Sequence, residues 1–122
     1  MEIESLYTPD LHERGAEMQV NDQYGKPLGL YLSIVGVDSK AWRKESKELR
    51  RATFQGDDAE DARAKCMAKC TLAWRGFESN GSPVEFSTEN VESLYKSAPY
   101  ILNQIDLFLV ERANFTESKE AT

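Results

Sequence analysis

One histidine and two cysteines are the side chains in this sequence best suited to metal binding or nucleophilic catalysis. Cys66 and Cys70 are four residues apart, a spacing at which one helix could offer two thiolates to a metal ion. A tetrahedral zinc site needs two more ligands, and a thiolate nucleophile needs a histidine nearby. His12 is distant in sequence and falls in a segment expected to be loose. We therefore expect two buried free thiols, no metal and no catalytic residue.

Carboxylates are numerous, but their spacing does not indicate a metal site or a catalytic site. Asp57, Asp58, Glu60 and Asp61 form the densest group. The glycine and the distal glutamate that a calcium loop requires are missing, and acidic side chains are typical of the first turn of a helix. The glycines also lack the context of a phosphate-binding loop. The sequence therefore predicts neither an enzyme nor a cofactor site.

A basic segment in the middle of the chain is the strongest charge feature. Its cations are Lys40, Arg43, Lys44, Lys47, Arg50 and Arg51. Glu45 and Glu48 dilute the run, so a solvated helix face is one interpretation, an acidic protein surface is a second and DNA is a third. For contacts between copies of this chain, the candidate residues are Lys40, Arg43, Lys47, Arg50 and Arg51.

Two aromatic residues in the same segment are candidates for partner binding. Trp42 and Phe54 lie on a predicted helix with few apolar positions, so the helix does not need to bury both. Each could instead be an ordinary core residue. Trp74 and Phe77, which flank Gly76, are expected in the core.

Composition and charge narrow the function classes. The 122 residues are 40% hydrophobic and 30% charged, a globular balance, and the net charge is -6. That charge argues against nucleic acids and anionic membranes as partners. Residues 1–37, 38–75 and 76–122 carry net charges of -4, +3 and -5, which could support contacts with other copies. The acidic N-terminus is unlike a secretory signal, so we expect a cytoplasmic protein.

The hydrophobic pattern predicts one α+β domain over residues 1–122, predominantly α-helical. Residues 17–36 alternate around a turn in which Gly25 takes a positive φ, as in a β-hairpin. Asp38 is the expected N-cap of the next helix, and Pro99 the expected start of the last, which is apolar on nearly every side. Four helices are predicted, at about 38–55, 57–74, 88–98 and 99–114. A loose arm at 1–15 and a frayed polar tail at 116–122 complete the chain.

Several segments together resemble a known family. They are SLYTP, VGVDSKAWRK and the stretch from LAWRGFESNGSPVEFSTENVESLYKSAPY to ILNQIDLFLVERANF. The chain from Leu6 to Phe115 resembles the tail assembly chaperones of long-tailed (siphovirus-type) bacteriophages and prophages. None of these segments is a catalytic signature.

The resemblance implies a mostly helical, non-catalytic assembly factor in the cytoplasm of the host bacterium, absent from the mature virion. It implies a protein that coats the tape measure protein, helps to recruit tail-tube subunits such as the major tail protein, and self-associates. Two alternatives belong to other classes. One is a small DNA-binding regulator that uses the basic helix 40–51, and the other is an inhibitor of a host enzyme.

Overall fold

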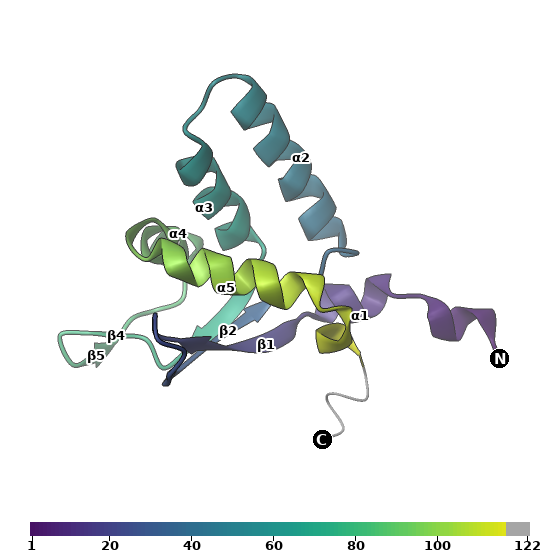
Figure 1. Cartoon of the computed structure of the whole chain (residues 1–122), viewed down its shortest axis with the longest axis horizontal. Coiled ribbons are helices and arrows are strands. Elements are labelled where there is room, and N and C mark those ends of the chain that lie inside the picture. The colour runs from purple at the N-terminus through teal and green to yellow at the C-terminus, as the bar shows by residue number, and fades with distance from the viewer. Residues whose placement is uncertain (117–122) are drawn as a thin grey trace.

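The structure is a computed structural model that describes residues 1–116. It is an α+β fold, mostly helical, as predicted. A three-stranded antiparallel sheet has the helices on one of its faces, and α2 and α3 project from it as a helical hairpin (Figure 1). Among the described residues, no helix covers the opposite face of the sheet (Figure 1).

The predicted hairpin is confirmed. Strands β1 (Ala16–Asn21) and β2 (Pro27–Ile34) pair antiparallel, and Gly25 in the turn between them has a φ of 87°. Alternate side chains of the two strands point into the core, because successive residues of a strand face opposite sides of a sheet. A lone hairpin is marginal in water, and here a third strand and the helices complete it.

The prediction of one helix over residues 57–74 is wrong at its C-terminal end. Helix α3 (Ala59–Lys69) ends early, and strand β3 (Thr71–Arg75) pairs with β2. Trp74 lies opposite the buried Leu32 in this pairing. Pairing with β2 and the packing of the partly buried Trp74 on the core outweigh the helical pattern of residues 57–75, which contain no glycine or proline.

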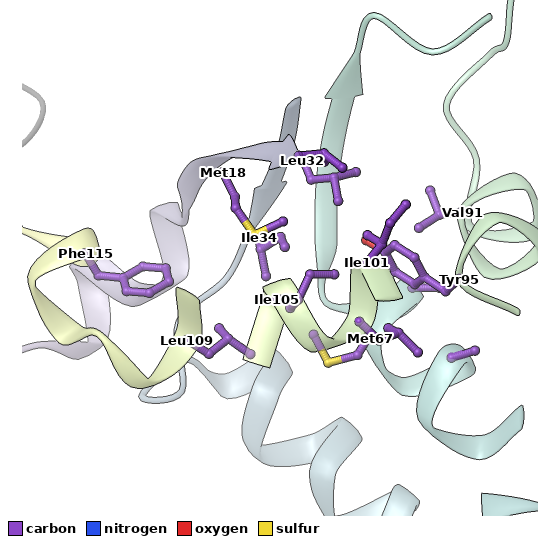
Figure 2. Packing of buried hydrophobic residues seen from close by; sticks show 14 residues of the cluster. Met18, Leu32, Ile34, Met67, Val91, Tyr95, Ile101, Ile105, Leu109 and Phe115 are labelled. Carbon is purple, nitrogen blue, oxygen red and sulfur yellow. The ribbon is translucent and has the colours of Figure 1, made fainter. Parts of the chain in front are cut away.

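The core lies between the sheet and the helices above it. Met18, Leu32 and Ile34 of the sheet face Ile101 and Ile105 of α5 (Pro99–Val110) (Figure 2). Helix α4 (Thr88–Ser97) and α3 close the remaining side (Figure 2). The other labelled members of this one cluster are Met67, Val91, Tyr95, Leu109 and Phe115.

Helix α5 is less buried than predicted. Leu107 and Val110 are 72% and 77% exposed, so only one face of α5 packs on the sheet. It also ends at Val110, four residues before the predicted end, and the 3-10 helix η2 (Arg112–Phe115) follows it. Phe115 turns back into the core from η2 (Figure 2).

The helix starts follow the expected chemistry with one exception. The side chains of Asp58 and Ser87 cap α3 and α4, and Pro99 lies in the first turn of α5. Helix α2 (Lys40–Phe54) is capped by Ser39, whose hydroxyl accepts the Trp42 N–H, and not by Asp38. The Asp38 carboxylate instead binds Arg112.

The N-terminal segment differs from the predicted loose arm of residues 1–15. A 3-10 helix η1 (Ile3–Leu6) and helix α1 (Pro9–Arg14) form there. His12 anchors α1, because its ring is buried and stacks on Phe115 with 4.9 Å between the ring centroids. Most of the predicted polar tail, residues 117–122, lies outside the described residues.

One side chain extends the pairing at the edge of β1, and a second, two-stranded sheet lies farther along the chain. The Gln104 side-chain amide pairs with the backbone of Asn21, accepting its N–H at 2.9 Å and donating to its carbonyl at 2.7 Å. The predicted Asn-Gly turn is confirmed between β4 (Glu78–Ser79) and β5 (Ser82–Pro83), with positive φ at Asn80 and Gly81.

Candidate partner-binding site

The cations of α2 form a stripe along one face of the helix. At 100° per residue all six fall within one third of the helix circumference, and all six are exposed. Glu45 and Ala52 occupy the opposite face, where α2 packs on α3. We call this surface the basic stripe; its members are Lys40, Arg43, Lys44, Lys47, Arg50 and Arg51.

The two acids of the segment interrupt the basic stripe less than the sequence suggests. Glu45 is buried against α3, and one of its carboxylate oxygens lies 3.8 Å from Nζ of Lys69. Glu48 accepts two hydrogen bonds from Arg51. Within residues 1–116, Arg51 is the one cation of the stripe that forms an ion pair. The stripe thus presents nearly all of its charge to solvent.

The structure separates the two candidate partner-binding aromatics. Trp42 is partly buried and packs against the core cluster near the base of the hairpin. Phe54 is 94% exposed at the other end of α2, about 18 Å away along the helix axis. On a helical projection Phe54 lies on the side of the basic stripe, whereas Trp42 lies on the packed side. They therefore do not form one surface, and Phe54 is the aromatic that remains accessible.

A cleft of about 600 Å³ lies where α2, α3 and α4 meet. Leu49, Ala52, Ala62 and Cys66 supply its apolar part. Charged side chains of both signs form its rim, including Glu48, Asp58, Asp61, Lys65, Lys69 and Lys96. The sequence analysis does not predict this cleft, because the rim comes from three helices and its charges alternate in sign.

The cysteines are buried free thiols, as predicted. Cys66 lies on α3 and Cys70 directly follows it. A hydrogen bond between the two thiols, together with burial, raises the pKa of Cys70, so this thiol stays protonated. Among residues 1–116, no group of three or more histidine, cysteine or acidic side chains is placed to hold a metal ion.

His12 belongs to a joint between the two ends of the chain. Its Nδ1 accepts the Asp38 N–H at 3.0 Å, and its Nε2 lies 3.7 Å from the Asp38 carboxylate. Arg112 donates two hydrogen bonds to that carboxylate, at 2.6 and 3.1 Å, and the Thr8 hydroxyl donates another. Only 1% of His12 is exposed, so a substrate cannot reach the ring.

No protein-family model matches this sequence, and neither the curated proteins nor the solved structures include a match. None of the helices within residues 1–116 combines the length and the apolar character needed for membrane crossing.

Proposed function

We propose that this protein is a tail assembly chaperone of a long-tailed bacteriophage or prophage. In this role it is a non-catalytic protein of the host cytoplasm that coats the tape measure protein, helps to recruit tail-tube subunits such as the major tail protein, and is absent from the mature virion. An uncovered tape measure protein would expose long apolar helical surfaces, which favour aggregation.

The observation that supports this proposal is where the residues that carry the resemblance lie. Asp38 and Arg112 join the start of α2 to the end of the chain. Trp74 stacks on Phe77 at 4.7 Å and meets the ring of Phe86 edge-on at 5.9 Å. Residues with these structural roles come from every part of the fold. The residues that carry the resemblance are therefore spread over the whole fold and not confined to one short motif.

The exposure of Phe54 also supports the proposal, because it leaves an aromatic side chain available for binding a partner. A fully exposed aromatic side chain at the tip of a projecting hairpin offers apolar contact area, and buried aromatic anchors contribute strongly to protein interfaces. The cleft beside α2 has an apolar part and a charged rim, which suits an amphipathic helix. A tape measure protein supplies helices of that kind.

Co-expression with the tape measure protein encoded in the same genome tests the proposal. The wild-type chain should raise the soluble fraction of the tape measure protein, and Phe54→Ala should reduce that effect. Tyr24→Ala is the matched control, because Tyr24 is 91% exposed but lies in the turn between β1 and β2. Circular dichroism of each variant alone should show an unchanged fold.

Trp42→Ala is interpreted differently. Because Trp42 packs against the core cluster, its removal should lower the free energy of unfolding, and a loss of function would not identify a contact. If the wild-type chain does not increase the solubility of its tape measure protein, the proposed function is wrong.

The basic stripe favours one alternative, a DNA-binding regulator that uses helix 40–51. Such a protein would shift duplex DNA at low salt, and the affinity would fall steeply as salt increases. The net charge of -6 and the acidic groups near both ends of α2 oppose this alternative.

A further inference from the structure

Most cations of the basic stripe are not paired with an acidic side chain in the described part of the chain. Helix α2 is about 22 Å long, and six cations lie along its exposed face. Lys40, Arg43, Lys44, Lys47 and Arg50 form no ion pair among the described residues. Like charges on one helix face repel each other, so an acidic surface that covers the stripe would relieve this repulsion.

A surface of opposite charge lies at the start of α3, the other helix of the helical hairpin. We call it the acidic edge, and it consists of Asp57, Asp58, Glu60 and Asp61. All four side chains are exposed, and none forms an ion pair within residues 1–116. Apart from the N-cap bond from the Asp61 N–H to Asp58, their carboxylates accept no hydrogen bond in the described part of the chain.

The two surfaces cannot cover each other within one molecule. On a helical projection the basic stripe lies opposite the buried face of α2, which packs on α3. The acidic edge belongs to the first turn of α3 and the loop before it, at the tip of the helical hairpin (Figure 1). They meet only at the tip, where Asp57 is near enough to Arg51 to help raise the pKa of that guanidinium, after the larger effect of Glu48. The acidic edge is therefore confined to the tip of the helical hairpin, because Lys65 and Lys69 lie farther along the same face of α3 as Asp58 and Asp61.

We propose that the basic stripe binds the acidic edge of a second copy of this chain, in a head-to-tail contact between opposite charges. This inference deepens the proposed function, since a coat along a tape measure protein needs contacts between copies. A contact between two different surfaces leaves one of each free on every dimer, so it continues into a ring or a spiral.

The charge distribution favours a second copy over a polyanion. Glu13 and Asp38 lie at the N-terminal end of α2, where a Glu13 carboxylate oxygen accepts the Lys40 N–H at 3.3 Å. The acidic edge begins directly after the other end. A continuous phosphate backbone would meet carboxylates at both ends of the stripe, whereas four acids of a short acidic edge would fit between them.

Two neutralising variants test this contact with the full chain alone. Arg43→Gln/Lys47→Gln/Arg50→Gln removes half of the stripe but keeps the acidic edge. Asp57→Asn/Glu60→Gln/Asp61→Asn weakens the edge but keeps the stripe and the Asp58 cap. Sedimentation velocity at low salt should show concentration-dependent assembly of the wild type and at least about tenfold weaker association of each variant.

Mixing the two variants gives the most specific result. The first variant keeps its acidic edge and the second keeps its basic stripe, so these two surfaces can still pair. The remaining stripe and edge of that dimer are both neutralised, so an equimolar mixture should form dimers that do not grow further. Wild-type assembly should weaken as salt approaches about 1 M, where the Debye length is about 3 Å. Lys26→Gln and Glu78→Gln, which remove exposed charges outside the helical hairpin of α2 and α3, should associate like the wild type.

Three outcomes would overturn the inference. They are a wild type that stays monomeric at high concentration and low salt, variants that associate as tightly as the wild type, and a monomeric wild type whose stripe binds duplex DNA. Each is measured without a tape measure protein. If copies do not associate but the chain still solubilises the tape measure protein, only the contact between copies is wrong. If copies associate as expected but the tape measure protein stays insoluble, only the proposed function is wrong.

Discussion

Asp38 and Arg112, 74 positions apart in the sequence, form a bidentate ion pair that fastens the end of the chain to the start of α2. Such a planar pairing is among the stronger hydrogen-bonded contacts available to side chains. The same carboxylate also accepts from Thr8 and lies 3.7 Å from Nε2 of His12. One side chain therefore holds together α1, α2 and η2.

Acid should weaken this joint at Asp38. The hydrogen bonds from Arg112, and then that from Thr8, lower the pKa of Asp38 from 3.8 to about 2. Because the folded-state pKa lies below the unfolded one, the unfolded chain binds more protons between these values, and this stabilisation is lost as pH falls from about 4 to about 2. Urea unfolding across this range should show a shallower acid slope for Asp38→Asn.

Arg112→Ala should have a similarly reduced slope, and the double variant should add little to either single change, because both disrupt one contact. Independent, additive losses would contradict the joint described here.

His12 should give a second pH dependence, nearer to neutral pH. Burial lowers the pKa of His12 below its ordinary 6.5, Asp38 partly opposes this shift, and Arg112 adds to it. Full stability should therefore be present above about pH 6.5, and part of it should be lost as the pH falls below that value.

His12→Gln should lack this dependence, because an amide does not titrate but can still accept the Asp38 N–H. Equilibrium unfolding at pH 7.5 and pH 5 measures the difference. Equal pH dependence in the variant and the wild type would show that another group is responsible.

Gly36→Ala should destabilise the protein because of the His12 ring. A Cβ at Gly36 would lie 2.2 Å from Nδ1 of His12, far inside van der Waals contact. Overpacking of this kind typically costs about 1–3 kcal/mol. Thermal and urea unfolding should show the loss. In a His12→Ala background the same change should cost less but still destabilise, because the Cβ of residue 12 remains 2.8 Å from the added Cβ. An equal cost in both backgrounds would mean that the His12 ring is not the main obstacle.

Two positions of α5 should respond in opposite ways to the same substitution. Ile105 is fully buried, so Ile105→Asp should cost several kcal/mol and unfold the domain, because the new charge has no partner. Leu107 is 72% exposed, so Leu107→Asp should leave a folded protein with nearly unchanged stability. Circular dichroism with urea titration distinguishes the two. Comparable unfolding by both changes would mean that α5 is buried on both faces.

The sequence predicts those parts of the fold in which local pattern and local chemistry agree. The hairpin shows alternation and turn residues, and α2 shows a long stretch without glycine or proline between clear end signals. Strand β3 could not be predicted, because Thr71 to Arg75 continues a helical composition and becomes a strand only by pairing with β2, far earlier in the chain. The burial of His12 could not be predicted for the same reason, since its partners Asp38 and Phe115 are remote in sequence.

The candidate site was predictable only in part. The cations of α2 follow from spacing alone, because residues three and four apart share a helix face. The different environments of Trp42 and Phe54 depend on where α2 leaves the body of the protein, which no local pattern encodes. The cleft depends on three helices and has no counterpart in any single segment.

The Gln104 amide on Asn21 has a consequence for the behaviour of many copies at high concentration. β1 is one of the two outer strands of its sheet, and an outer strand offers unpaired N–H and C=O groups to which a foreign strand can add. Gln104 occupies both groups of Asn21, as a neighbouring strand would, and thereby closes this end of the edge. Crowded copies are thus hindered from adding a strand at this end of β1, while their helical surfaces stay free to associate.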